Sequence, residues 1–385
     1  MTDHAPADAV KNYQAVLDQI FGPNETSVKQ IGNKIHNVLG ALISSQFDKF
    51  SDCFLNRLTR LAGYYPAGSA GRVKIIQLLQ DLTHPGNWAG PYAELVAIDF
   101  LNFHGVKKHF GDPIVLENKL PATETWASSF PNRVEADLDC SFPELLDVYA
   151  DVKLFQDTAD DYLSKLVADF QIKYPDAAVL PQKPVHIREI DGSVRQDLLK
   201  ELESTAANKE THLQSKIVTG LSYRLAWERP SVLLSEGTLD PYHMAETHHQ
   251  KVFSYTDKFT KNNSFVLVFV QPPWREHRLP VHLRVNQEFC RAMSRRVFCQ
   301  YIHSAELHKN LFPKVTTQET LYDVSRTISA IVFLVDESPE CADPSDLNVK
   351  AYSYTNPNAK TPLNSLFDSY MREWAPIERF THDNY

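Results

Sequence analysis

The first ninety residues of the chain carry apolar side chains at spacings of three and four, which is the pattern of helices packed against a core. One such stripe runs over Val28–Leu61, and a second covers about Gly71–Leu82. A third helix is expected over Pro91–His104, because proline suits the first turn of a helix. The pattern therefore predicts an N-terminal helical region over residues 1–90, followed by a further helix.

The hydrophobic period changes to two beyond this point, which predicts strands. Pro113–Leu120, Arg133–Phe142 and Leu145–Phe155 follow one another with prolines between them. Ser264–Val270 is apolar without interruption, as in a central strand that is buried on both faces, and Ile328–Val335 has the same character. Strands and helices in this order indicate an α/β protein.

The chain divides at two places where the pattern of hydrophobic and polar residues changes. Residues 157–240 return to a helical pattern with polar segments, which we interpret as a large helical insertion. We expect a core over residues 91–275 that contains this insertion. Residues 276–385 are then a C-terminal α/β extension packed on the core.

Composition narrows the class of protein. The chain has 385 residues, of which 43% are hydrophobic and 23% charged, as in folded globular proteins rather than disordered or fibrous chains. The longest apolar run, Ser264–Val270, is far shorter than a membrane-spanning helix. The first residues, MTDHAPADAV, lack the basic and apolar regions of a signal peptide. We therefore expect a cytoplasmic protein that does not contact the membrane.

Acidic residues gather on two of the predicted strands. Strand alternation places Glu135, Asp137 and Asp139 on one face, opposite an apolar face. On the next strand, the same rule places Asp151 and Lys153 together. If the two strands are neighbours, Asp137 or Asp139 lies beside Asp151. Like charges in this position repel one another and need a compensating cation.

Glu94 adds an acid from a different element. Its helix is apolar on nearly every side, so a carboxylate there is costly unless it is paired or bound to a metal. Carboxylate oxygens in this number favour Mg²⁺ or Mn²⁺ over zinc. The chemistry that these residues indicate is metal-assisted phosphodiester hydrolysis, in which Lys153 orients or polarises the attacking water.

A glutamate on a helix, an aspartate on the second strand and a D-x-K motif on the third strand resemble the PD-(D/E)XK, or restriction-endonuclease-like, nuclease superfamily. The resemblance covers roughly residues 91–156, with a closing helix and strand between about Tyr242 and Val270. It implies an αβββαβ core, a mixed sheet flanked by helices. Two departures are that no proline precedes the strand aspartate and that about 85 residues are inserted before the closing helix.

The resemblance also implies roles for individual residues. Glu94 corresponds to the helical acid, and Asp151 and Lys153 to the D-x-K pair. Asp137 and Asp139 both remain candidates for the strand acid, with Asp139 preferred because it lies nearer the strand end. The implied metal ligands are the four acids, and the implied catalytic set adds the lysine: Glu94, Asp137, Asp139, Asp151 and Lys153.

By this resemblance we expect a magnesium-dependent endonuclease that cuts DNA, with RNA as the other substrate to consider. A type II-like restriction endonuclease or a defence nuclease fits the chain, which contains no ATP-binding P-loop motif. The first alternative is a catalytically inactive relative that binds nucleic acid or a protein partner. The second is an interaction protein whose acidic strand face is simply solvated. A homodimer is a further expectation to test, since many relatives cut two strands with two sites.

The overall charge is acidic, with 39 Lys and Arg against 48 Asp and Glu and a net charge of −9. This balance argues against a protein that coats nucleic acid or another polyanion without specificity, but it allows a local basic groove. Four arginines at helical spacing are candidates for contacts with a nucleic-acid backbone, the alternative being a solvated helix face: Arg284, Arg291, Arg295 and Arg296.

Histidines and cysteines provide weaker signals. His243, His248 and His249 do not place two ligands on one helical face as an H-E-x-x-H zinc motif does, so we interpret them, with His277 and His282, as ordinary polar histidines. The five cysteines contain no C-x-x-C pair. We expect them to be reduced thiols in the core.

Overall fold

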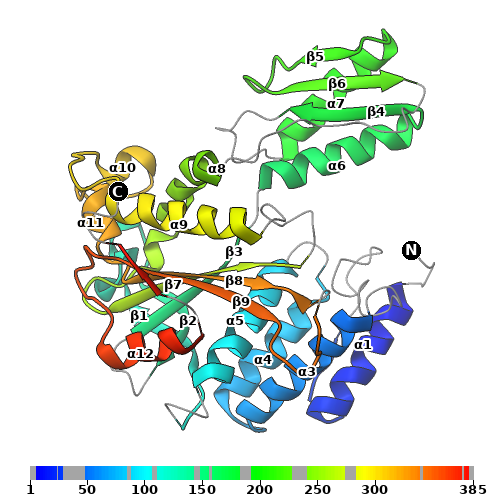
Figure 1. Cartoon of the computed structure of the whole chain (residues 1–385). Helices are drawn as coiled ribbons and strands as arrows, with labels where there is room; N and C mark the ends of the chain where they lie inside the picture. Colours follow the sequence, from blue (N-terminus) through cyan, green and yellow to red (C-terminus); the bar gives the residue numbers. More distant parts are fainter. Residues whose placement is uncertain are drawn as a thin grey trace. The chain divides into compact units, whose positions relative to one another are not determined.

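The computed structural model describes residues 6–23, 25–28, 48–84, 88–105, 111–142, 148–155, 158–182, 192–227, 241–273, 283–338, 341–374 and 377–380. The chain forms two compact units (Figure 1). Unit 1 comprises Met1–Phe155, Lys251–Trp274 and Ser294–Tyr385, and unit 2 comprises Gln156–Gln250 and Arg275–Met293. No helix in these described ranges is long and apolar enough to cross a membrane.

Unit 1 is built on a mixed sheet, so the prediction of an α/β fold is confirmed. The central strands β3, β7 and β8 are parallel, whereas β1, β2 and β9 each pair with a neighbour in the antiparallel sense. The short strand β10 pairs with β9 in parallel. In spatial order the seven strands of this sheet are β1 (Val115–Pro121), β2 (Glu135–Phe142), β3 (Val148–Leu154), β7 (Ser264–Gln271), β8 (Ala330–Asp336), β9 (Val349–Thr355) and β10 (Ile377–Arg379).

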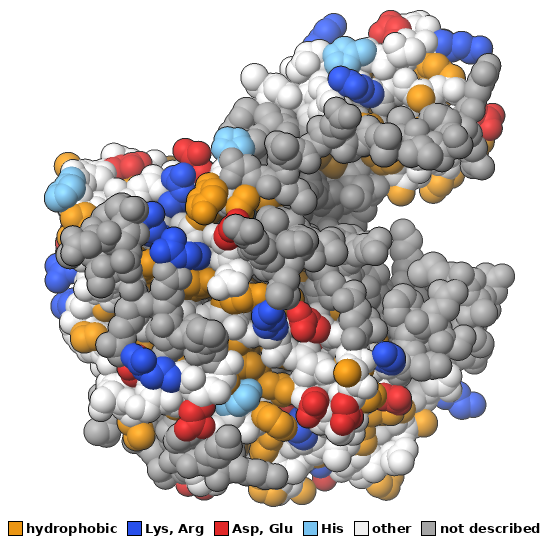
Figure 2. Space-filling view, in the orientation of Figure 1, with side chains coloured by type: hydrophobic (Ala, Val, Ile, Leu, Met, Phe, Trp, Pro, Cys, Tyr) orange, Lys and Arg blue, Asp and Glu red, His pale blue; other side chains and the backbone are white. Residues whose placement is uncertain are grey.

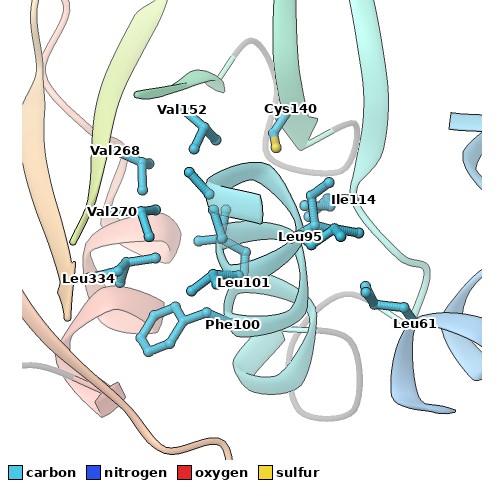
Figure 3. Close-up of a cluster of buried hydrophobic side chains, with 14 of the residues drawn as sticks. Leu61, Leu95, Phe100, Leu101, Ile114, Cys140, Val152, Val268, Val270 and Leu334 are labelled. Atoms are coloured by element: carbon cyan, nitrogen blue, oxygen red, sulfur yellow. The ribbon is translucent and has the colours of Figure 1, made fainter. Parts of the chain in front are cut away.

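Helices cover one face of this sheet, and helix α5 (Ala89–Gly105) lies at their centre. It is apolar all round because it packs between the sheet and other helices. Figure 3 shows its side chains Leu95, Phe100 and Leu101 among those of strands β2, β3, β7 and β8. The surrounding helices are α1 (Pro6–Phe21), α3 (Asp48–Tyr64), α4 (Ala70–Asp81) and α12 (Ser365–Trp374). The part of the stripe over residues 29–47 lies outside the described residues.

Shorter elements pack on the opposite face of the sheet. The ring of Phe265 on β7 lies 5.1 Å from that of Phe259, and the ring of Phe269 lies 6.4 Å from that of Tyr255. β7 is buried at every position, as its uninterrupted hydrophobicity predicts. The other helical elements in the described ranges are η3 (Ala122–Glu124), η4 (Trp126–Ser129), η6 (His249–Lys258), α9 (Leu283–Cys299), α10 (His308–Leu311) and α11 (Leu321–Ser325). Of these, η6 begins in unit 2, and α9 belongs to unit 2 as far as Met293.

Unit 2 differs from the helical insertion expected over residues 157–240. Alternate residues of its strands, such as Tyr223 and Leu225, bury one face against two helices and form a separate core. These runs are short and include Pro181, so their alternation is a weak signal in the sequence. Unit 2 therefore combines helices with a three-stranded sheet: α6 (Thr158–Lys173), β4 (Ala177–Gln182), α7 (Gly192–Ala207), β5 (His212–Gln214), β6 (Ser222–Trp227) and α8 (Pro241–His248).

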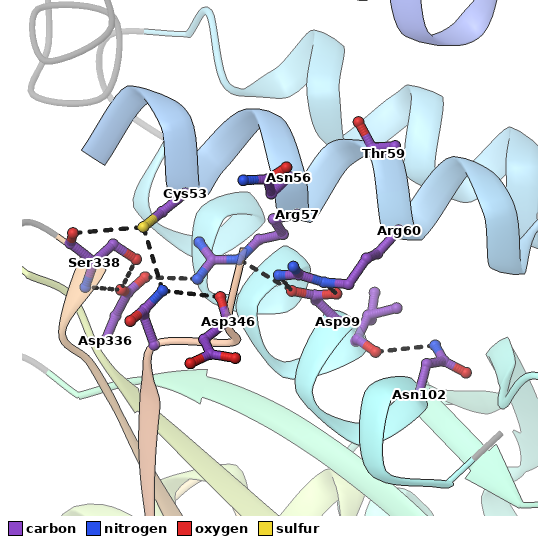
Figure 4. A network of polar contacts seen from close by, with 12 residues as sticks. Cys53, Asn56, Arg57, Thr59, Arg60, Asp99, Asn102, Asp336, Ser338 and Asp346 are labelled. Atoms are coloured by element: carbon purple, nitrogen blue, oxygen red, sulfur yellow. Dashed lines mark hydrogen bonds and ion pairs between the residues drawn. The ribbon is translucent and has the colours of Figure 1, made fainter. Parts of the chain in front are cut away.

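A network of buried charges ties α3 and α5 to the end of β8 (Figure 4). The Arg57 guanidinium lies 3.1 Å from Asp336 and 3.5 Å from Asp99. Arg60 donates to both carboxylate oxygens of Asp99, at 2.9 and 2.7 Å. Tyr92 donates its hydroxyl proton to Asp336 at 2.5 Å. We call these five residues the Arg57 network; each of its carboxylates has hydrogen-bonded partners.

Candidate functional site

The candidate site lies where strands β2 and β3 separate. These strands are paired only over Cys140–Phe142 and Val148–Ala150. β1 nevertheless stays paired with β2 as far as Glu135, and β3 stays paired with β7 as far as Leu154. The sheet therefore opens into a fork beyond Cys140 and Ala150. Strands that diverge in this way leave unpaired backbone groups that side chains can reach.

Asp139 and Asp151 are the first residues of the two strands beyond the last paired positions. An Oδ atom of Asp139 accepts a hydrogen bond from the backbone N–H of Val152 at 2.8 Å, so its carboxylate occupies the fork. Asp151 is completely buried. The two carboxylates therefore lie close together, as the alternation of the sequence predicts for neighbouring strands.

The cations of this site come from two segments. Lys153 forms an ion pair with Asp151, and its ammonium lies 5.3 Å from the centre of the Tyr255 ring. Lys258 donates to the backbone carbonyl of Asp137, and its positive charge also acts on Asp151. Tyr255 and Lys258 both belong to η6, which therefore delivers an aromatic ring and a second ammonium to the fork.

Glu94 reaches the same region from α5, on the helical side of the sheet. The Lys74 ammonium of α4 lies 3.2 Å from a carboxylate oxygen of Glu94 and 2.9 Å from one of Glu117 on β1. Glu94 also interacts electrostatically with Asp139. Glu94, Asp139, Asp151 and Lys153, called the fork cluster below, are thus brought together from three elements.

Burial and mutual repulsion alter the acidity of this cluster. Burial, followed by the charge of Asp139, raises the pKa of Asp151 to about 8, although Lys153 opposes the shift. Burial and Asp139 likewise raise the pKa of Glu94 to about 7, against the opposing effect of Lys74. Burial alone would lower the pKa of Lys153, but Asp151 and Asp139 raise it above its usual value. Lys153 therefore stays charged at neutral pH.

The residues of the fork suit a hard divalent cation. Oδ1 of Asp151 is buried and has no hydrogen-bond partner in the described part of the chain. Asp139 and Asp151 could hold Mg²⁺ or Mn²⁺ together with water and a substrate phosphate, which is how Mg²⁺ is commonly bound. The described ranges contain no group of three or more His, Cys, Asp or Glu side chains placed to hold a metal ion by themselves.

Asp137, the other candidate for the strand acid, is placed differently. Its side chain is 67% exposed and lies 3.9 Å from the Lys119 ammonium. The neighbouring acid Glu135 is also exposed, 4.0 Å from the same lysine. The structure thus brings Asp139 into the fork and leaves Asp137 at the surface.

The candidate arginines for nucleic-acid contact lie on α9. Arg291, Arg295 and Arg296 are partly buried and each interacts with other groups of the protein. Arg284 lies in the same helix, but its side chain is outside the described set. On the face that Figure 2 shows, basic and acidic side chains are interspersed over the described surface. These features do not identify the α9 arginines as a basic surface for nucleic acid.

The histidines and cysteines behave as ordinary residues. His249 is buried and its Nδ1 lies 2.7 Å from the carbonyl oxygen of Glu246, while His243 is exposed. His277 and His282 lie outside the described residues. All five cysteines lie in the described residues, are buried and form no disulfide, so the prediction of core thiols is confirmed. The Sγ atoms of Cys53 and Cys341 lie 3.1 Å apart beside the Arg57 network.

Three residues of the site could not be found by pattern. Lys74 lies within α4, Glu117 lies within β1, and Lys258 is the last residue of η6. Each comes near the fork only through tertiary packing. The left-handed backbone of Glu117, with a φ of 55°, distinguishes this residue in the structure but cannot be read from the sequence.

Comparison with known proteins adds no further identification. No protein-family model matches the chain, and no curated protein or solved structure matches it either.

Proposed function

We propose that the fork is the active site of a magnesium- or manganese-dependent endonuclease that hydrolyses phosphodiester bonds in DNA, as a type II-like restriction or defence nuclease. One observation carries this proposal. Asp151 is completely buried beside Asp139, with one carboxylate oxygen lacking a hydrogen-bond partner in the described part of the chain. A carboxylate in this state is costly to keep in the fold, and a bound cation offsets that cost.

The order of the elements supports the same proposal. Helix α5 is followed by the antiparallel strands β1, β2 and β3, and β7 then joins β3 in parallel. We take this order, with unit 2 inserted in the chain between β3 and β7, as support for the mixed αβββαβ core that the PD-(D/E)XK resemblance implies. Glu94 lies on that helix, Asp139 on the second strand, and Asp151 and Lys153 on the third.

The protein groups have distinct roles in this proposal. Asp139 and Asp151 would hold the cation, which when bound would activate water and stabilise the charge that develops on the phosphate. Lys153, held beside Asp151 and fully charged, donates hydrogen bonds to the attacking water or to a phosphate oxygen. Because its pKa is raised, Lys153 stays protonated and acts as a positively charged hydrogen-bond donor rather than as a general base.

The direct test is cleavage of plasmid DNA, single-stranded DNA and RNA with Mg²⁺, Mn²⁺ or EDTA. We expect metal-dependent cutting of DNA that falls by about 1,000-fold in Asp151→Asn and Lys153→Ala, since each removes charge from the reacting centre. Glu135→Gln is the matched control, because Glu135 is an exposed acid on the same strand as Asp139. Equal loss of activity in the control would remove the fork from catalysis.

Thermal unfolding supplies a second measurement that does not depend on finding the right substrate. We expect Mg²⁺ to raise the melting temperature of the wild type, because a ligand that binds only the folded state stabilises it. Asp151→Asn should abolish this shift. Absence of both cleavage and shift would reject the nuclease. A shift without any cleavage would favour the inactive nuclease-fold protein that binds nucleic acid or a protein partner.

A further inference from the structure

A second group of charges adjoins the fork on the side of α5. Lys74 places its ammonium between the carboxylates of Glu94 and Glu117, at 3.2 and 2.9 Å. The Lys74 side chain is 13% exposed and that of Glu94 is 19% exposed, so the contact between these two is largely shielded from water, whereas Glu117 is 48% exposed. Shielding makes the attraction stronger than that of a surface ion pair.

The backbone of β1 is shaped to complete this contact. Leu116 faces Cys140 and Asn118 faces Leu138, so Glu117 lies at the level of Asp139 on the neighbouring strand. Glu117 has a φ of 55°, a left-handed conformation that residues other than glycine adopt at a cost. Its carboxylate nevertheless meets Lys74, which α4 brings up against both α5 and β1. The ammonium is thus held from two sides.

Two-metal nucleases use a second divalent cation to neutralise charge near the scissile phosphate. In this protein the carboxylates on the α5 side of the fork already have a cation of their own in Lys74. We infer that Lys74, with Glu117, is a positioning residue that holds Glu94 and takes the place of a second metal ion, so that the fork binds a single divalent cation at Asp139 and Asp151. This inference rests on the proposed metal site.

The test measures how many Mn²⁺ ions the full-length protein binds, by calorimetry and by the electron paramagnetic resonance signal of free Mn²⁺. We expect one ion in the wild type and two in Lys74→Met, because Glu94 and Glu117 lose their ammonium. Lys74→Arg, which keeps the charge, should restore binding of one ion. Lys119→Met is the matched control, since Lys119 is a 65% exposed lysine of β1 that pairs with Glu135 and Asp137.

The possible results separate this inference from the proposed function. A wild type that binds no Mn²⁺ would reject the metal site itself. One ion in the wild type, none in Asp151→Asn and still one in Lys74→Met would keep the metal site and overturn the role of Lys74. If Lys74→Met fails to fold, Glu117→Gln loosens the same contact and should weaken the hold on Glu94. In that case the inference requires that the affinity of the fork for Mn²⁺ in Glu117→Gln differs from the affinity in the wild type. An unchanged affinity would overturn the inference.

Discussion

The Arg57 network and the fork cluster are both built from buried charges in unit 1, but they are satisfied in different ways. In the network, Asp336 accepts hydrogen bonds from Tyr92, Arg57 and the backbone N–H of Ser338. Asp99 is bound through both oxygens by Arg60. Every carboxylate there has donors matched to its oxygens.

In the fork, by contrast, acids face one another and one oxygen of the buried Asp151 lacks a hydrogen-bond donor in the described residues. Burial raises the pKa of Asp99 in the network as well as that of Asp151 and Glu94 in the fork, but in the fork the charge of Asp139 adds to the shift. The two clusters therefore differ in their hydrogen bonds and in the repulsion between acids, not in burial. The comparison indicates that the Arg57 network stabilises the structure and that the fork cluster is arranged to bind a ligand. Carboxylates whose oxygens all accept hydrogen bonds stabilise a fold, whereas a buried carboxylate oxygen without a donor leaves a position for a cation or substrate.

The largest effect is expected from breaking the Arg57 network. Arg57→Gln leaves Asp336 and Asp99 without their shared guanidinium, and losing one partner of a buried ion pair costs about 3–5 kcal/mol. Arg372→Gln is the matched control, because Arg372 pairs with Asp368 on the surface of α12 and such pairs contribute at most about 1 kcal/mol. Urea unfolding of both variants measures the difference. Equal losses would show that the network stabilises the fold no more than a surface pair does.

An effect of opposite sign and smaller size is expected in the fork. Asp151→Asn should raise the free energy of unfolding of the metal-free protein by about 1–2 kcal/mol. The pKa of Asp151 is raised to about 8, so at neutral pH the folded state must keep this carboxyl group protonated while the unfolded state ionises it, and the neutral amide removes that cost. The same substitution in the network, Asp336→Asn, should lower it. Both are measured at neutral pH in EDTA. Destabilisation by both would mean that Asp151 is a structural residue like Asp336.

The sequence predicts part of this site because strand alternation is a local property. Period two places Asp139 on one face of β2 and Asp151 with Lys153 on one face of β3, and the structure brings these residues together. The choice between Asp137 and Asp139 depends on where the strands separate. That point is set by how far each strand pairs with its neighbours, which no local pattern reveals.

The helical side of the site and unit 2 show the limit of such reasoning. Lys74 reaches Glu94 only because α4 packs against α5 and β1, contacts between segments that a periodic pattern does not connect. In unit 2, β4 and β6 alternate over a few residues each, too short a run to distinguish from helix or loop. β9 likewise becomes a recognisable strand through its pairing with β8.

The smallest effect, and the sharpest test of where the fork ends, is expected at Asp137. Its exposed side chain lies on the same strand as Asp139 but pairs at long range with Lys119. Asp137→Asn should change the free energy of unfolding by less than about 0.5 kcal/mol, as for most surface substitutions, and should leave the Mg²⁺-induced rise in melting temperature intact. Asp139→Asn should abolish that rise, because it removes a carboxylate from the fork itself. If Asp137→Asn abolished the rise as well, the cation would have to lie further along β2. The site would then include an exposed acid and could no longer be defined by the buried carboxylates of the fork.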